Sequence, residues 1–337
     1  MKPKKKLLIL IGLVTCSVLL STGFLSTPAQ AQKPIEWKMI ISWMPEYIPI
    51  KKIFIPFVER VNKKAEGKLK IAWVGPEAVP PFEQLKPVRE GLFDLSFTHS
   101  AYHMGEVSVG QGMDLFKATG KERRAAGLNK IVDEAYRKKA NVTYLAAMPD
   151  GVGYHLMLRN QKIDKADLTG LKIRTSPFYD PMIKTLGGAP VRTAGGEIYT
   201  ALEKGVVDGA CWPAIGALDY KWYEVAKYQV RPCFGDTIYQ VLVNLNSWNR
   251  LSRDLQDLLT NTAIEVEEEG RKAMVASLEG EEKELQKRGM DLLPLPPKEA
   301  EKYLNTFYDR SWEELVLKRD PEFGPRLKEA ADRIRKK

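Results

Sequence analysis

The chain has 337 residues, of which 44% are hydrophobic, so it is long enough for one large domain or two smaller ones and does not read as low-complexity or repetitive. Its formal net charge is +9, but four of the lysines lie within the first six residues and the other charges are dispersed. No basic block with interleaved aromatic residues occurs, which argues against a nucleic-acid-binding protein.

The first 31 residues have the layout of a secretory signal peptide. The cationic start MKPKKK is followed by the apolar run LLILIGLVTCSVLLSTGFL and by the small-x-small sequence AQA, which ends at Ala31. This pattern predicts cleavage after Ala31 and export to the periplasm. Two alternatives stay open. The apolar run is about long enough for a transmembrane anchor, and Cys16 ends a poor lipoprotein motif, LVTC.

Strand and helix patterns alternate along the rest of the chain. We expect strands at 36–43, 69–74, 93–99, 141–148, 153–160, 171–174 and 207–212. We expect helices at 50–65, 82–90, 121–139, 178–186 and 197–204. This alternation predicts parallel βαβ units and an α/β fold.

Residues 253–288 are helical throughout by composition. A continuous helix of that length would span about 54 Å, which is enough to cross two lobes. Gly270 and Gly280 interrupt the pattern, so two consecutive helices are the alternative.

The chemical signatures of enzymes are missing from the sequence. It contains no P-loop, no G-x-G-x-x-G, no H-E-x-x-H and no G-x-S-x-G. His99 and His103 are four residues apart, but they follow a strand and no carboxylate–histidine set completes a metal site. We therefore expect no catalytic residues, no metal and no cofactor. Beyond the leader, Cys211 and Cys233 either form a disulfide, which export permits, or stay as isolated thiols.

Arg174 directly follows the apolar strand pattern in GLKIR. In open α/β sheets ligands gather at the carboxyl ends of strands, and a guanidinium there offers a planar pair of donors to a carboxylate. Other predicted strand ends carry His99, Tyr102, His155 and Trp212. Together these side chains predict an apolar pocket with few convergent polar groups, whereas a surface arginine is the plainer alternative for Arg174.

Three segments, GLKIR, GGEIYTALEKGVVDGACWP and REGLFDLSF, together resemble the substrate-binding proteins of TRAP (tripartite ATP-independent periplasmic) transporters. The resemblance covers about residues 35–319. It implies a two-lobed α/β periplasmic binding protein fold with a long helix spanning both lobes. Such proteins close over an organic acid and deliver it to membrane permease subunits. Arg174 stands at the position of the family's carboxylate-binding arginine. The implied lobe I comprises 32–152, 241–282 and 311–337, and the implied lobe II comprises 153–240 and 283–310.

The sequence departs from the family's sialic acid binders at His155, Trp212 and His99, which replace an arginine, an asparagine and an acidic contact. The resemblance therefore implies a less charged, more aromatic pocket. Some relatives with a tryptophan at the Trp212 position bind 2-oxo acids through a metal ion, but Cys211 replaces their acidic ligand. Besides Arg174, the expected ligand-binding residues are Trp43, Phe82, His99, Tyr102, His155, Phe178, Tyr179, Trp212 and Tyr239.

The expected ligand is a monocarboxylate with an apolar or aromatic body, a 2-oxo acid included. A binding protein of an ATP-driven importer and an exported hydrolase are the rival interpretations. The missing nucleophile–base pair argues against the hydrolase.

Overall fold

The structure is a computed structural model that describes residues 33–149 and 151–335. The predicted signal peptide and its two alternatives lie outside the described residues. Within the part of the chain that is described, no helix has both the length and the apolar character that a membrane span needs.

The first sheet has the strand order β2-β1-β3-β10-β4. Strand β1 pairs in parallel with β2 and β3, and β10 lies antiparallel between β3 and β4. Because β1 and β3 are parallel, the residues that follow them meet at the same edge of the sheet. The strands are β1 (Ile35–Ile41), β2 (Leu69–Val74), β3 (Leu95–Thr98), β4 (Val142–Pro149) and β10 (Ile238–Asn244).

The second sheet has the order β11-β9-β5-β8-β6-β7. Strand β6 is parallel to β7 and β8, and β5 is antiparallel to β8 and β9. The strands are β5 (Tyr154–Leu158), β6 (Lys172–Thr175), β7 (Ala189–Arg192), β8 (Gly209–Pro213), β9 (Tyr228–Arg231) and β11 (Asp291–Pro294). The prediction of parallel units is wrong for β5, and β10, which was not predicted, is also antiparallel to its neighbours. Each of these strands enters its sheet directly from the other sheet, and a strand that returns this way can run antiparallel without a crossover helix.

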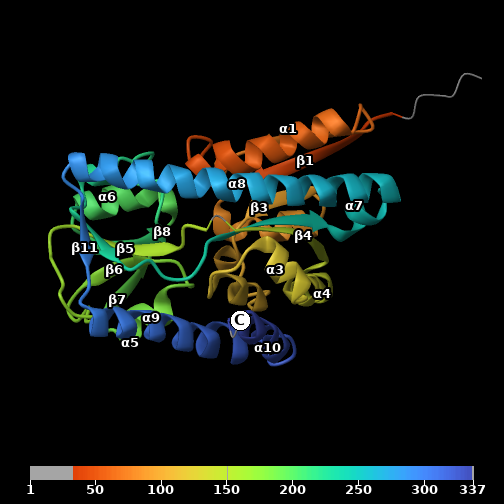
Figure 1. Ribbon diagram of the computed structural model, residues 1–337. Coiled ribbons are helices and arrows are strands. Elements are labelled where there is room, and N and C mark those ends of the chain that lie inside the picture. The colour runs from red at the N-terminus through yellow and green to blue at the C-terminus, as the bar shows by residue number, and fades with distance from the viewer. Residues whose placement is uncertain (1–32, 150, 336–337) are drawn as a thin grey trace, which may run out of the picture. The chain divides into compact units, whose positions relative to one another are not determined.

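Helices cover both sheets (Figure 1). Thr119 and Glu122 form a capping box that starts α3. The single helix predicted at 121–139 is two helices, because Gly127 adopts φ 80° and breaks the chain direction between α3 and α4. The α-helices other than α8 are α1 (Ile55–Lys64), α2 (Leu85–Arg89), α3 (Gly120–Ala125), α4 (Leu128–Ala140), α5 (Asp180–Thr185), α6 (Ile198–Glu203), α7 (Leu245–Asn249), α9 (Pro297–Ser311) and α10 (Gly324–Arg335).

Helix α8 (Arg253–Lys287) is continuous over 35 residues, so the one-helix alternative is confirmed. It contacts α1 and β4 beside the first sheet and β11 in the second, and Figure 1 shows it running across elements of both. Gly270 allows a close approach, since a Cβ there would lie 2.9 Å from Cγ1 of Ile53. The two-lobed architecture with a shared long helix is thus present.

The exact division into lobes stays a proposal. Strand β4 ends at Pro149 and β5 begins at Tyr154, so the proposed boundary at 152/153 falls between the two sheets. The proposed boundary at 240/241 falls inside β10, which belongs to the first sheet from Ile238 onward. We therefore propose to place the second boundary before Ile238.

Candidate ligand-binding site

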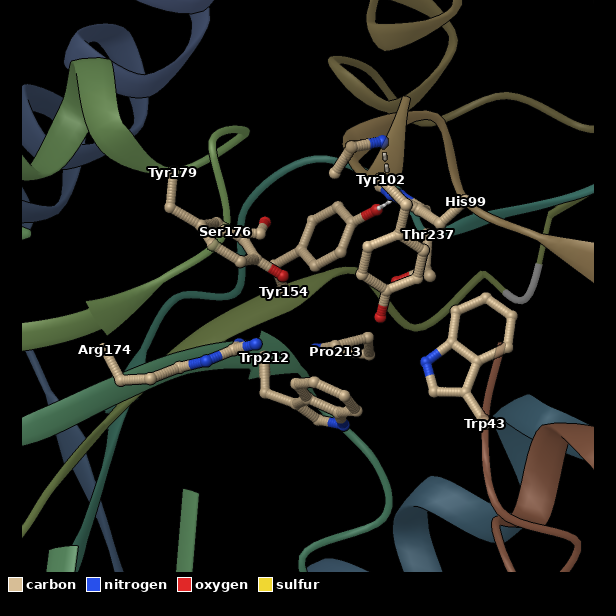
Figure 2. Close-up of a pocket in the computed structure, with 11 residues that line it drawn as sticks. Trp43, His99, Tyr102, Tyr154, Arg174, Ser176, Tyr179, Trp212, Pro213 and Thr237 are labelled. Carbon is tan, nitrogen blue, oxygen red and sulfur yellow. Dashed lines mark hydrogen bonds between the residues drawn. The ribbon is translucent and has the colours of Figure 1, made fainter. Parts of the chain in front are cut away.

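A pocket lies where strand ends of the two sheets face each other, and we call it the Arg174 pocket (Figure 2). Its cavity volume is only about 20 Å³, which is room for about one water molecule. The conformation described is therefore nearly closed. The lining residues are Trp43, His99, Ala101 and Tyr102 from the first sheet's loops, Tyr154, Arg174, Ser176, Tyr179, Trp212 and Pro213 from the second sheet and its loops, and Thr237 from the segment before β10.

Arg174, near the end of β6, is 1% exposed. Its Nε and Nη2 donate hydrogen bonds to the carbonyl oxygen of Thr193 at 3.0 and 2.6 Å, and its Nη1 donates to the carbonyl oxygen of Cys211 at 3.1 Å. The guanidinium carbon lies 5.2 Å from the centre of the Trp212 ring. Burial lowers the pKa of Arg174, but a guanidinium stays charged at neutral pH.

The contacts of Arg174 leave donors free for a ligand. A guanidinium has five N–H groups, and the two backbone carbonyls use one on each nitrogen. One N–H on Nη1 and one on Nη2 remain, and both are available to a carboxylate. Among the ion pairs of the described residues, none includes Arg174. The pocket thus holds a buried guanidinium that forms no ion pair among the described residues.

His99, Asp114 and Tyr154 form a hydrogen-bonded group behind the pocket. Nδ1 of His99 accepts from the backbone N–H of Ala101 at 3.0 Å, so the ring proton sits on Nε2, which lies 2.9 Å from Oδ1 of Asp114. The hydroxyl of Tyr154 donates to the same oxygen at 2.6 Å. These bonds hold the His99 ring in one orientation at the pocket. They also occupy the buried Asp114 carboxylate, which forms no ion pair with Arg174.

The remaining polar groups of the pocket are neutral donors. Burial raises the pKa of Tyr102 to about 12 and that of Tyr179 well above its ordinary value, so both hydroxyls keep their protons. Ser176 and Thr237 add two further hydroxyls. Figure 2 shows the Arg174 guanidinium and the Tyr102 hydroxyl directed toward the same space. One cation surrounded by neutral hydroxyls and aromatic rings is suited to one anionic group.

Six of the ten predicted site residues line the Arg174 pocket, and four do not. The six are Trp43, His99, Tyr102, Arg174, Tyr179 and Trp212. The plainer reading of Arg174, as a surface arginine, is wrong because the side chain is buried.

His155 is one of the four that do not line the pocket. Neighbouring residues of a strand point to opposite faces, and on β5 it is Tyr154 that reaches the pocket. Nδ1 of His155 accepts from Nη1 of Arg231 at 3.2 Å, and Arg231 pairs with Glu282 on α8. Burial, reinforced by the Arg231 charge, lowers the pKa of His155 well below its ordinary value. His155 is therefore a neutral residue between the sheet and α8.

Phe178, Tyr239 and Phe82 are also outside the pocket lining. The Phe178 ring packs on Tyr154, with centroids 5.0 Å apart. The Tyr239 ring stacks on Phe97 at 5.5 Å. Phe82 is 39% exposed and meets Tyr102 edge-on. Phe178 and Tyr239 are core residues behind the pocket walls, whereas Phe82 contacts the lining residue Tyr102 from the solvent side.

Five lining residues were missing from the prediction. Tyr154 and Pro213 are direct neighbours of predicted residues, and Ser176 lies two positions after Arg174, on the same face of an extended chain. That spacing is a signal in the sequence. Ala101 and Thr237 have side chains whose type carries no such signal.

A sequence profile described as "Bacterial extracellular solute-binding protein, family 7" matches residues 42–317. This chain belongs to that family. Solved structures similar to it are solute-binding proteins of TRAP transporters. One is from Desulfovibrio salexigens and has bound orotic acid. Its TM-score is 0.77 and its sequence identity 21%, and the match covers 89% of this chain and 99% of that chain. Another is from Bordetella bronchiseptica and has copurified calcium and picolinate. Its TM-score is 0.78 and its sequence identity 22%, and the match covers 89% of this chain and 92% of that chain.

A curated relative is the monocarboxylate 2-oxoacid-binding periplasmic protein of Nostoc sp. (strain PCC 7120). It is 27% identical over 273 residues, which is 76% of this chain and 72% of the relative. The residues that line the Arg174 pocket do not fit a calcium ion, because none of them is an aspartate or a glutamate and Arg174 already places a positive charge there. Cys211 has a free, buried thiol whose pKa is raised by burial, and this thiol is not part of the pocket lining. Within 33–149 and 151–335, no three His, Cys, Asp or Glu side chains gather in a metal-binding group. Because Cys211 is free, the alternative of a disulfide to Cys233 is wrong.

In this family 7 protein, Glu281 of α8 holds the segment that follows β8. Its carboxylate accepts hydrogen bonds from the backbone N–H of Gly216 at 2.8 Å and of Leu218 at 3.3 Å. Burial raises the pKa of this carboxyl to about 7, against the effect of the N–H donors. Tyr220, in the same segment, packs on Trp212 with ring centroids 6.0 Å apart. Glu281 thus connects the long helix to a wall of the Arg174 pocket.

We expect the Glu281→Gln variant to gain stability relative to the wild type as pH rises. The folded-state pKa lies above the ordinary 4.5, so the unfolded chain releases this proton first and the wild type loses stability between pH 4.5 and about 7. Glutamine does not titrate, and the relative gain should be on the order of 1–3 kcal/mol. Chemical denaturation at either end of this window measures it. The exposed Glu279→Gln on the same helix is the control, and equal pH profiles for Glu281→Gln and wild type would contradict the assignment.

Proposed function

We propose that this chain is the extracytoplasmic solute-binding protein of a TRAP transporter and binds an organic carboxylate at Arg174. The buried guanidinium, with two free N–H groups and no carboxylate partner among the described residues, is the observation that carries the proposal. A ligand carboxylate supplies the missing counter-charge when the two lobes close. The protein then delivers the ligand to the membrane permease subunits.

The ligand is a monocarboxylate with an apolar or aromatic body, 2-oxo acids included. Arg174 is the only lysine or arginine among the residues that line the pocket. A second carboxylate group on the ligand would therefore find no cationic partner in the pocket, and the Asp114 carboxylate would lie close to it. Trp43, Tyr102 and Trp212 offer apolar area instead. The 2-oxoacid named for the Nostoc relative, and the orotic acid and picolinate in the two solved structures, are consistent with such a ligand.

Binding requires an open state. A cavity of about 20 Å³ does not hold an organic acid, so the ligand enters while the lobes are apart, and the lobes then close around it into a form with a larger pocket than the one described. The segments between β4 and β5 and between β9 and β10, together with α8, connect the two sheets. We propose that these connections act as the hinge.

Isothermal titration against a panel of carboxylates tests the proposal. We expect aromatic and branched monocarboxylates and their 2-oxo forms to bind more tightly than short-chain acids and C4 dicarboxylates. The affinities should be the same with and without EDTA, because no carboxylate lines the pocket to hold a cation. Tight binding of small dicarboxylates alone would contradict the aromatic-monocarboxylate proposal.

Uptake by vesicles that contain the permease separates the TRAP function from its rivals. Transport should require this protein and an ion gradient and should not require ATP. Dependence on ATP would favour an ATP-driven importer. Chemical conversion of the acid by the purified protein would favour an exported hydrolase.

A further inference from the structure

A second, larger cavity adjoins the Arg174 pocket, and we call it the outer hollow. Its volume is about 290 Å³. Trp43 and Tyr102 line both cavities, and their ring centroids lie 5.8 Å apart. These two side chains therefore form the partition between the Arg174 pocket and the outer hollow.

The two sides of this partition are held differently. The Trp43 ring also packs on Phe97 and Tyr239, both of which are buried. Tyr102 packs on Phe82, which is 39% exposed. Tyr102, which also meets His99 edge-on, is thus the less buried member of the partition, and an acid that spans both cavities requires it to move.

The outer hollow is apolar and contains no cation. Met44, Pro76, Pro80 and Pro81 form much of its wall, and no lysine, arginine or histidine lines it. Its one carboxylate belongs to Glu77, where Oε1 accepts a hydrogen bond from the backbone N–H of Gly75 at 3.0 Å. This environment disfavours a second anionic group and favours hydrocarbon.

We propose that the outer hollow is a second subsite, which holds the apolar body of the acid whose carboxylate binds Arg174. This inference rests on the proposed function. An apolar cavity of about 150 Å³ is enough for benzene, and 290 Å³ is larger, so the subsite accepts an aromatic ring or a branched chain. The preferred ligand is then an extended acid, with its apolar part beyond Trp43 and Tyr102, and not a compact acid confined to the Arg174 pocket.

A glycine in the wall of the outer hollow provides a direct test. A Cβ added at Gly196 meets no atom within 4 Å, and Gly196 has no positive φ, so Gly196→Leu fills open space without backbone strain. Gly195 is unsuitable, because a Cβ there would lie 2.5 Å from the Trp212 ring. Gly280→Leu makes the same chemical change on the exposed side of α8, where there is also open space, and is the matched control.

The experiment compares the affinities of 3-phenylpropionate and propionate for the wild type, Gly196→Leu and Gly280→Leu by isothermal titration. Burying the ring should give the wild type a preference for the phenyl acid of roughly tenfold or more. Gly196→Leu should lose about tenfold for the phenyl acid and less than about twofold for propionate, and Gly280→Leu should match the wild type.

Either of two titration results would overturn the subsite. In the first, Gly196→Leu keeps the wild-type preference for 3-phenylpropionate over propionate, and in the second it loses equal affinity for both acids. A crystal structure with 3-(4-bromophenyl)propionate gives an independent reading, because the anomalous bromine signal must lie beside Met44 and Gly196. A bromine inside the Arg174 pocket would also overturn it. If no carboxylate of the panel binds the wild type, or if Arg174→Ala binds them as tightly as the wild type, the proposed function itself fails, which is a different outcome.

Discussion

Replacing Arg174 with alanine is expected to weaken carboxylate binding by roughly 30- to 4000-fold, since loss of a buried charge-assisted contact costs about 2–5 kcal/mol. The guanidinium is held by two backbone carbonyls and offers one N–H on each terminal nitrogen to the ligand. Titration with the tightest acid of the panel measures the loss, and circular dichroism checks that the variant is folded.

Two further variants separate the contact from net charge. Arg174→Lys keeps the charge but loses the paired donors, so its affinity should lie between those of wild type and Arg174→Ala. Arg159→Ala removes an arginine just after β5 whose Nη2 donates to the carbonyl oxygen of Glu203, and it should leave binding unchanged. An Arg174→Ala protein that binds within about twofold of wild type would show that the anchor lies elsewhere.

The second large effect is expected at Arg123, on α3, whose Nη2 lies 2.8 Å from Oδ2 of Asp236. Both side chains are almost fully buried, and Asp236 lies in the segment that connects β9 to β10. Arg123→Met leaves the Asp236 carboxylate without its cation, which should lower the free energy of unfolding by about 3–5 kcal/mol. Chemical denaturation at neutral pH measures the change.

The pH dependence of this variant has a predicted sign. Burial already raises the pKa of Asp236, and Arg123 opposes that effect. Without Arg123 the carboxyl stays protonated in the folded state to higher pH, so the destabilisation should grow as pH rises above the ordinary pKa of 3.8.

A double variant and a surface control complete the experiment. Arg123→Met combined with Asp236→Leu removes both charges and should be more stable than Arg123→Met alone. Arg253→Met breaks an exposed i,i+4 pair with Asp257 and should change stability by less than about 1 kcal/mol. A double variant less stable than Arg123→Met would show that the pair does not act through mutual neutralisation.

The strands and helices with strong local patterns can be predicted from the sequence. β2 lies at the predicted 69–74, and α8 follows the predicted 253–288 to within one residue. No element is predicted between 213 and 252, although β10 is a fully buried run of seven residues. Its insertion between β3 and β4 joins segments about a hundred or more residues apart, and periodicity carries no information about such pairing.

The site was predictable where it depends on strand ends. Arg174, Trp212, His99 and Trp43 follow or end parallel strands, whose carboxyl ends converge. His155 was predicted to line the pocket, but its neighbour Tyr154 does so instead. A shift of one residue along a strand moves the side chain to the opposite face of the sheet. Whether a ring such as Phe178 or Tyr239 faces a cavity or the core depends on packing from distant segments, which no local pattern contains.

The position of β10 has a consequence for how the polypeptide matures. The central part of the first sheet is completed by residues 238–244, which are synthesised after five of the six strands of the second sheet. A nascent chain that stops before Ile238 leaves the facing edges of β3 and β4 with no strand to join them. We therefore expect the first sheet to be completed only after about three quarters of the chain has been synthesised.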